Sequence, residues 1–342
     1  MGVNALIVFS VAALLVRLGL PGAIRFAQRI KLISSKLRVH DGASARGAIP
    51  CAGGMVVVGV AVVLSVAYSA AVRQPLAPGM AWVVVGTFAM LIAGMYDDAC
   101  PLRVGALLAI QTVVALVMLR VGVSISTVIL PSVFNGVFTV LWMILMMNAL
   151  NMLDVLDGLA GGVAAIAAVG LAIAGGMTAN ASVGVFSAAL AGGLLGFLTM
   201  NFYPARVYLG NHGSLSIGFL LSTLALQISY APLGREMALG TPLLILGVPL
   251  FDVAFVVWRR CRQRKPLWKG SGDHLALRLI RCGWSERFVV LFFYGCSIVF
   301  VASGLLLMRL GNWAGALTLA AAVFVIGLAA SRACRMDADA IR

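Results

Sequence analysis

Two groups of carboxylates and carboxamides stand out in a chain that has few charged residues. In the first group, Asp97 and Asp98 are adjacent. Adjacent carboxylates repel each other unless a cation or a proton lies between them. Mg²⁺ is the natural candidate, because it prefers oxygen ligands and pairs with phosphate groups. The pair therefore predicts a metal-assisted site for a phosphorylated molecule, with ordinary solvated loop charges as the alternative.

The second group has polar residues at every third position, namely Asn148, Asn151, Asp154 and Asp157. On a helix, this spacing places the four side chains along one slowly turning face. Asn151 and Asp154 can then share a metal or a nucleotide, and Gly158 permits a close approach of the backbone. One Asn or Asp could serve as a helix cap, but four polar groups exceed what a cap needs.

The elements that position these groups are predicted to be membrane-spanning helices. Only 11% of the 342 residues are charged and 62% are hydrophobic, whereas soluble domains are about a quarter charged. Long apolar runs without strand alternation indicate helices, which satisfy their own backbone hydrogen bonds in lipid. We expect an all-α, polytopic bundle that forms a single domain over residues 1–342. The eleven predicted spans, of about 20 residues each, are 2–21, 49–72, 79–96, 104–123, 128–148, 158–178, 181–201, 213–231, 237–258, 288–309 and 312–332.

The basic residues predict the orientation of this bundle. Twenty of the 25 Lys and Arg residues flank the spans on one side, and four flank them on the other. Positive charge marks the cytoplasmic side, so we expect the N-terminus outside and the C-terminus in the cytoplasm. Both acidic groups fall on the cytoplasmic side. The expected cytoplasmic loops lie near residues 22–48, 97–103, 148–157, 202–212 and 259–287.

The net charge of +14 follows from the same loops, and it also attracts anionic lipid headgroups or phosphorylated substrates. Nucleic-acid binding is disfavoured, because the sequence contains no soluble basic domain. A transporter is the rival membrane function. It predicts charges near the bilayer midplane, whereas the acids of this chain gather at one face.

Five motifs, in order along the chain, resemble those of the polyprenyl-phosphate N-acetylhexosamine-1-phosphate transferases, a glycosyltransferase family 4 type that includes undecaprenyl-phosphate and phospho-MurNAc-pentapeptide enzymes. The resemblance covers about residues 45–285. The motifs are Arg46 to Gly54; Gly94 to Asp98 with Leu102, Arg103 and Gln111; Asn148 to Gly162; Asn201 to Leu215; and Pro249 to Asp252 with Asp273 to Leu275.

The resemblance implies a reaction in which a sugar 1-phosphate, of the N-acetylhexosamine class, passes from a UDP-sugar to a polyprenyl phosphate and UMP is released. This would be the first step of a lipid-linked glycan pathway at the cytoplasmic face of the bacterial inner membrane. The implied cofactor is Mg²⁺, with Mn²⁺ as an alternative. The implied partners are the UDP-sugar, the polyprenyl phosphate and membrane lipids. A homodimer is left open.

The resemblance also implies a role for each of twelve residues. The metal ligands would be Asn151 and Asn211. The catalytic residues would be Asp97, Asp98, Asp154 and His274. The substrate-binding residues would be Arg46, Arg103, Asn148, Asp157, Asn201 and Tyr208.

The chain departs from the family pattern at functional positions. Asn211 stands where the family usually has an Asp that binds magnesium, and Ala276 and Leu277 stand where it has further histidines. Val155 also replaces a usual Gly. These departures keep a second hypothesis open, a degenerate member that binds a nucleotide-sugar or a lipid phosphate without turnover.

Overall fold

The computed structural model of the chain describes residues 2–30, 32, 49–125, 131–230, 236–266, 272–309, 317 and 320. The chain divides into two compact units, Met1–Ile228 and Ser229–Arg342, each of which is described by itself. The expectation of a single membrane domain stays a prediction.

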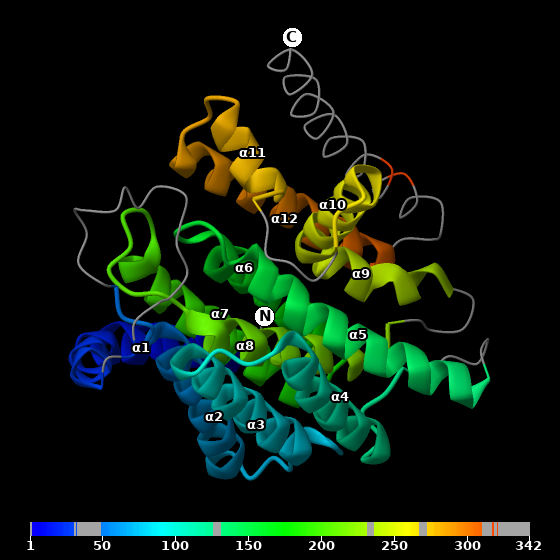
Figure 1. Cartoon of the computed structure of the whole chain (residues 1–342). Coiled ribbons are helices and arrows are strands. Elements are labelled where there is room, and N and C mark those ends of the chain that lie inside the picture. Colours follow the sequence, from blue (N-terminus) through cyan, green and yellow to red (C-terminus); the bar gives the residue numbers. More distant parts are fainter. Residues whose placement is uncertain are drawn as a thin grey trace. The chain divides into compact units, whose positions relative to one another are not determined.

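Among the described residues, the first unit contains eight helices, coloured blue to green in Figure 1. They are α1 (Val3–Arg29), α2 (Gly53–Ala71), α3 (Met80–Ala99), α4 (Val104–Arg120), α5 (Ser132–Leu153), α6 (Leu159–Met177), α7 (Ala181–Asn201) and α8 (Gly210–Leu226). Across the described residues, the only extended pairing is an isolated bridge between Cys51 and Tyr208. The all-α prediction is therefore confirmed for the part of the chain that the structure describes.

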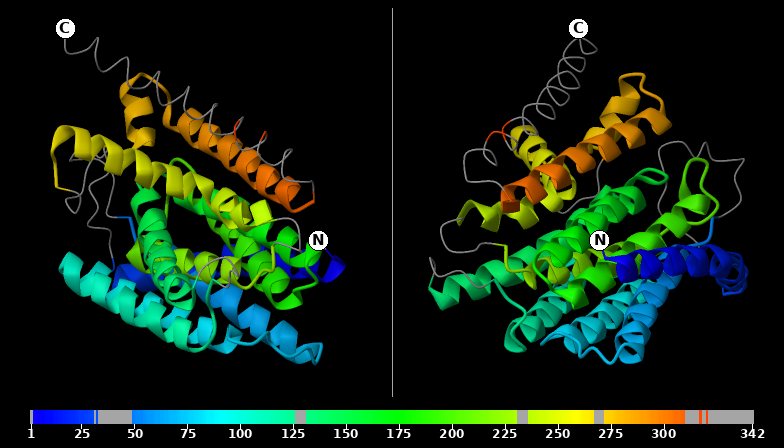
Figure 2. Two further views of the ribbon diagram at one scale, coloured as in Figure 1. Left: turned by 90° about the vertical axis from the view of Figure 1, so that its right-hand side faces the viewer. Right: turned by 180° about the vertical axis from the view of Figure 1, so that it is seen from behind.

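The second unit is also helical. It contains a short 3-10 helix, η1 (Glu236–Gly240), followed by α9 (Thr241–Ile245), α10 (Gly247–Gln263), α11 (Leu275–Arg281) and α12 (Glu286–Arg309). The long helix α12 packs against α9, α10 and α11, as the orange and yellow ribbons of Figure 2 show.

Seven helices of the described residues are long and apolar enough to cross a membrane, namely α1, α2, α3, α5, α6, α7 and α12. The number rises to eight if the bent pair η1/α9 and α10 counts as one span. The expected spans 104–123 and 213–231 correspond to the shorter helices α4 and α8. The expected span 312–332 lies outside the described residues, apart from positions 317 and 320.

The expected span 237–258 is not a single straight helix, because the chain bends by 73° between Ile245 and Gly247. The cause is Pro249, which has no N–H to donate to the carbonyl of Ile245 and whose ring clashes with that carbonyl. The chain therefore ends one helix at Ile245 and starts another at Gly247.

Two helix boundaries near the polar groups also differ from those expected. Helix α5 continues beyond residue 148 to Leu153, and α8 begins at Gly210, ahead of residue 213. Consequently Asn148 and Asn151 lie on α5, and Asn211 lies in the first turn of α8. These side chains belong to helix ends and not to loops.

Helix α8 is the central helix of the first unit (Figure 1). Every residue of α8 is buried except Asn211 and Leu226. The helix packs mainly against α3, α5 and α2, and it also contacts α6 and α7. Polar side chains that meet Asn211 must therefore come from the helices around α8.

Two glycines allow neighbouring helices to approach the first turn of α8 closely. A Cβ atom on Gly94 of α3 would lie 2.3 Å from Cα of His212, and one on Gly54 of α2 would lie 2.2 Å from Cα of Gly213. Small residues of this kind let helix backbones come close together in membrane proteins. The close approach brings the end of α3 within hydrogen-bonding distance of the start of α8.

Candidate functional site

The adjacent carboxylates Asp97 and Asp98 lie in the last turn of α3 and are half-buried. A helix C-terminus carries partial negative charge, so two carboxylates there are unfavourable without a partner. In the structure both face the first turn of α8, where free backbone N–H groups and the positive end of the helix dipole favour an anion. These N–H groups offset part of the repulsion for which the sequence suggested a cation.

Asn211 is held by both carboxylates of the pair. Its side-chain Nδ2 donates to Oδ2 of Asp97 at 2.8 Å, and its backbone N–H donates to Oδ1 of Asp98 at 3.0 Å. Oδ1 of Asp97 accepts a further hydrogen bond, at 2.8 Å, from the backbone N–H of Leu102. The predicted catalytic residues Asp97 and Asp98 and the predicted metal ligand Asn211 are thus brought together.

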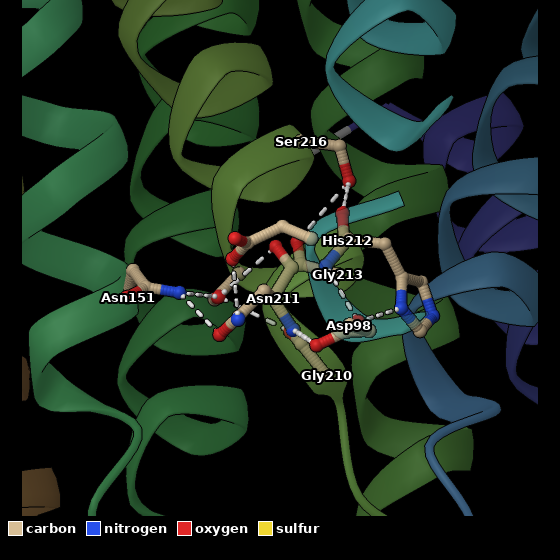
Figure 3. A network of polar contacts seen from close by, with 9 residues as sticks. Asp98, Asn151, Gly210, Asn211, His212, Gly213 and Ser216 are labelled. Atoms are coloured by element: carbon tan, nitrogen blue, oxygen red, sulfur yellow. Dashed lines mark hydrogen bonds and ion pairs between the residues drawn. The ribbon is translucent and has the colours of Figure 1, made fainter. Parts of the chain in front are cut away.

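Asn151 completes the contacts of Asn211 from α5. Its Nδ2 donates to Oδ1 of Asn211 at 3.0 Å and to Oγ of Ser214 at 2.8 Å. Figure 3 shows Asn151 and Asp98 reaching Asn211 from opposite sides. The two predicted metal ligands, Asn151 and Asn211, are therefore hydrogen-bonded neighbours, although one lies on α5 and the other on α8.

His212 makes a second contact with Asp98. Its ring Nδ1 lies 2.6 Å from Oδ2 of Asp98, and its backbone N–H donates to the same oxygen at 3.2 Å. The imidazole is fully buried, and its Nε2 has no hydrogen-bond partner among the described residues. Asp98 therefore binds the start of α8 through two backbone groups and one side chain.

Asn148 contacts a different helix from Asn151. Its Nδ2 donates to Oε1 of Gln111 on α4 at 2.6 Å and to the carbonyl of Ile144 at 2.7 Å. Gln111 is fully buried. The predicted substrate ligand Asn148 thus joins α4 to α5, one helical turn before Asn151.

Asp154 and Asp157 lie in the connection between α5 and α6, and both are buried. Asp154 is the residue that ends α5. Oδ2 of Asp157 accepts a hydrogen bond from the backbone N–H of Ala205 at 2.9 Å. In the same region, Asn201 accepts from the N–H of Gly158 at 3.0 Å and donates to the carbonyl of Val207 at 2.9 Å. Asp157 and Asn201 therefore join the α5–α6 connection to the α7–α8 connection.

Tyr208 lies in the α7–α8 connection and is buried. Its backbone N–H donates to the carbonyl of Pro50, and its carbonyl accepts from the N–H of Gly53, both at 3.0 Å. These bonds attach the segment before α8 to the start of α2. The position of Tyr208 is thus set by the chain around the Pro50–Gly54 motif.

Comparison with known proteins finds a family whose model covers the segment that holds this cluster. The model of glycosyl transferase family 4 matches residues 80–229, the segment that holds Asp97, Asp98, Asn151 and Asn211. This segment is similar to the family. The motif resemblance read from the sequence is therefore confirmed.

The chain is also similar to several named transferases. The chain is 28% identical, over 91% of its length and 87% of the relative, to a Bacillus subtilis protein named probable undecaprenyl-phosphate N-acetylglucosaminyl 1-phosphate transferase. It is 38% identical to the phospho-N-acetylmuramoyl-pentapeptide-transferase of Moorella thermoacetica, over 36% of the chain and 37% of the relative. It is 37% identical to the decaprenyl-phosphate N-acetylglucosaminephosphotransferase of Mycobacterium tuberculosis, over 32% and 30% respectively.

Three further predicted residues have no contact with the Asn211 cluster among the contacts of the described residues, or lie beyond those residues. Arg103 is exposed at the start of α4. Arg46 lies outside the described residues. His274 lies in the second unit, where its Nδ1 is 2.7 Å from Oδ2 of Asp252 and both side chains are buried. The family match at residues 80–229 does not extend to His274.

The side chains around Asn211 offer oxygen atoms of the kind that Mg²⁺ prefers. No cluster of three or more His, Cys, Asp or Glu residues suited to a metal occurs among the described residues. Mg²⁺, however, commonly takes only one or two protein carboxylates and completes its shell with water and substrate phosphates. Asp97 accepts two hydrogen bonds, whereas a carboxylate offers about four acceptor positions. Asp97, together with the amide oxygen of Asn211, therefore fits such a site.

Sequence reasoning gave no role to His212 and left its partner unnamed. The signal was present, because His212 is one of only three histidines and lies between Asn211 and Gly213 in a recognised motif. Its contact with Asp98 spans 114 positions of the sequence, and spacing along the chain cannot predict such a contact. The pairing of His274 with Asp252 was missed for the same reason.

Proposed function

We propose that the protein transfers an N-acetylhexosamine 1-phosphate from a UDP-sugar to a polyprenyl phosphate and releases UMP. The single observation that supports this most is the hydrogen-bond cluster around Asn211. In this cluster Asp97 and Asp98 of α3 and Asn151 of α5 contact the start of α8. The names of the relatives support the same chemistry, since two of them carry a prenyl phosphate and an N-acetylglucosamine phosphate in their names.

The proposed reaction is a phosphoryl transfer. An oxygen of the polyprenyl phosphate forms a bond to the phosphorus that carries the sugar, and the bond from that phosphorus to the bridging oxygen breaks. UMP leaves with the bridging oxygen, and the lipid retains a pyrophosphate linked to the sugar. Catalysis of such transfers consists mostly of positioning and charge neutralisation.

We propose that Asp97 orients the attacking lipid phosphate or accepts its proton. Asp97 is half-buried and is held by Leu102 and Asn211, so its direction is fixed before the substrate binds. A preorganised group of this kind needs no rearrangement during the reaction. Asp98 accepts three hydrogen bonds from the start of α8, one more than Asp97 accepts, and is therefore less suited to touch the substrate.

We further propose that Mg²⁺ is bound by Asp97 and by the amide oxygen of Asn211, with Mn²⁺ as a substitute. The ion would supply positive charge to the pyrophosphate of the UDP-sugar. In this arrangement Asn151 keeps the Asn211 carboxamide in place through its hydrogen bond to Oδ1.

The remaining predicted residues are proposed to bind the substrates from the surrounding connections. Asp154, Asp157 and Asn201 would shape the pocket for the nucleotide, with Tyr208 next to the uracil. Arg103 is exposed and would contact phosphate oxygens, since Arg forms charge-assisted hydrogen bonds to them. Arg46 and His274 are proposed for the same contacts.

We propose that the site opens to the cytoplasm and that the protein lies in the bacterial inner membrane, with its N-terminus outside. The asymmetry of basic residues, twenty against four, supports this orientation. A UDP-sugar made in the cytoplasm would then reach the site without crossing the membrane.

Purified protein in detergent, supplied with Mg²⁺, tests the proposed function. UMP should appear only when both a UDP-sugar and a polyprenyl phosphate are present, and a panel of UDP-sugars should identify the preferred sugar. Folded protein that binds the nucleotide-sugar but releases no UMP with any member of the panel would contradict the proposal.

A further inference from the structure

His212 is an unusual residue for the interior of an apolar bundle. Its side chain is fully buried, and its backbone lies at the point where Gly94 of α3 approaches α8 closely. One ring nitrogen, Nδ1, lies 2.6 Å from Asp98, while the other, Nε2, is buried without a hydrogen-bond partner among the described residues. Burying Nε2 without a partner is costly. A histidine at this position therefore needs a compensating benefit, and the contact of its Nδ1 with Asp98 is the candidate.

The geometry fixes the form of the neutral ring. With the hydrogen on Nδ1, the ring donates to Asp98 and only a lone pair of Nε2 stays unmatched. With the hydrogen on Nε2, a buried N–H would lack an acceptor, and the Nδ1 lone pair would face a carboxylate oxygen. The Nδ1–H form is therefore favoured, and His212 serves as a hydrogen-bond donor to Asp98.

Asp98 accepts three hydrogen bonds in this arrangement. Its Oδ1 accepts from the backbone N–H of Asn211, and its Oδ2 accepts from the backbone N–H and the ring of His212. All three donors belong to the first turn of α8. A carboxylate with these contacts holds a helix end in place, which differs from the catalytic role that the sequence suggested for it.

The backbone before α8 leaves room for this contact. Gly210 has φ +78°, in the left-handed region that favours glycine. A Cβ on Gly210 would lie 2.6 Å from Nδ1 of His212 and 2.8 Å from Oδ2 of Asp98. Ser216 holds the other side of the same turn, because its hydroxyl donates to the carbonyl of His212 (Figure 3).

We propose that His212 is a positioning residue for the sugar-phosphate transfer. Through Asp98 it fixes the first turn of α8, and the fixed turn sets the carboxamide of Asn211 against Asp97 and Asn151. Asp98 is assigned to the same positioning role. The inference rests on the proposed function, since the position of Asn211 affects the reaction only if this cluster binds the reacting pyrophosphate.

Two substitutions separate positioning from packing. In His212→Asn the side-chain Nδ2 can take the place of the ring Nδ1 and donate to Asp98, although the side chain is smaller. In His212→Leu the volume is filled but the donor is lost. Loss of a hydrogen bond to a charged group should lower kcat by about ten- to a hundred-fold in His212→Leu, with KM for the UDP-sugar changed by less than about three-fold. His212→Asn should stay within about five-fold of the wild-type kcat.

A control variant on the same helix tests for general damage. Ser222→Ala removes a buried hydroxyl that bonds only to the carbonyl of Phe219, far along α8 from the site. It should leave kcat per folded molecule unchanged. If His212→Asn is impaired as severely as His212→Leu, or if His212→Leu retains the wild-type kcat, the imidazole contributes packing alone and the proposal is wrong.

Hydrogen exchange provides a reading that does not depend on activity. Exchange of the backbone amides of residues 208–214, followed by mass spectrometry, should be faster in His212→Leu than in the wild type and close to the wild type in His212→Asn and Ser222→Ala. Equal exchange in all four proteins would overturn the positioning role. If the wild type releases no UMP, the proposed function fails, and the exchange result still decides whether His212 anchors α8.

Discussion

At the scale of single residues, the uncharged carboxamide of Asn211 can lie against Asp97 without a cation, whereas a carboxylate at this position would be repelled by Asp97. Its Nδ2 donates to Oδ2 of Asp97 at 2.8 Å, so this carboxylate oxygen has a hydrogen-bond partner without a cation. A carboxylate at position 211 would instead place one of its negative oxygens close to the negative oxygen of Asp97. Two charges about 4 Å apart repel by about 4 kcal/mol near a protein surface, and a bound cation removes that repulsion. The residue at position 211 therefore sets how strongly the site requires a metal.

Asn211→Asp should consequently increase the dependence of the protein on Mg²⁺. In the presence of a chelator the variant should unfold at a lower temperature than the wild type, because the repulsion is unrelieved. Mg²⁺ should raise its unfolding temperature more than that of the wild type, and half-maximal activity should occur at lower Mg²⁺. Thermal unfolding in detergent and a Mg²⁺ titration of UMP release measure both effects.

The conservative change Asn148→Asp provides a matched control, since Asn148 contacts Gln111 and not Asp97. It should show no comparable gain in stabilisation by Mg²⁺. If Asn211→Asp responds to Mg²⁺ no more than the wild type does, the metal does not bind at position 211.

At the scale of helices, the sequence predicted most of the elements and fewer of their ends. Apolar runs of the required length identify a span regardless of its neighbours, and α2, α3, α6 and α7 lie close to their expected ranges. Helix α1 begins as expected but continues to Arg29, eight residues beyond the expected end at residue 21. Boundaries depend on local chemistry that hydropathy does not register. Pro249 bends a run that is apolar throughout, and the polar Asn151 continues α5 because it has partners on α8.

The candidate site was predicted as a set of residues but not as a set of contacts. Adjacency and spacing singled out Asp97, Asp98 and Asn151, and the family resemblance added Asn211; these four residues do converge. Their mutual hydrogen bonds join positions 60 to 114 residues apart. Such contacts depend on how α3, α5 and α8 pack, and spacing along one sequence does not show which helices pack together.

The close approach of α3 to α8 at Gly94 can be tested by a substitution. Gly94→Ala places a methyl group 2.3 Å from Cα of His212, where only backbone atoms could move aside. Such overpacking should destabilise the protein by about 1–3 kcal/mol and should displace the first turn of α8, so that UMP release also falls. Thermal unfolding and the activity of the folded fraction measure the two effects.

Gly59→Ala on α2 is the matched control, because a Cβ there meets nothing within 4 Å. It should be neutral or stabilise by up to about 1 kcal/mol, since Ala favours helix more than Gly does. If the two alanine variants behave alike, close approach at Gly94 does not determine the position of α8.

At the scale of the whole molecule, the proposed orientation places Cys100 and Cys261 at the cytoplasmic face. Both thiols are exposed. In single-cysteine proteins, a membrane-impermeant maleimide should label neither residue in intact cells and both in inverted membrane vesicles. A single cysteine introduced at the exposed position Arg73, as Arg73→Cys, should label in intact cells. Labelling of Cys100 from outside would reverse the orientation and remove access to cytoplasmic UDP-sugar.

The central claim concerns the whole enzyme, namely that this helical protein joins a sugar phosphate to a membrane lipid at Asp97. The most direct measurement is mass spectrometry of the lipid product formed by purified protein from a UDP-N-acetylhexosamine, a polyprenyl phosphate and Mg²⁺. The wild type should form the lipid-linked sugar pyrophosphate in equal amount to UMP, and folded Asp97→Asn should form at least about a hundred-fold less. UMP without the lipid product, or equal product from Asp97→Asn, would contradict the account.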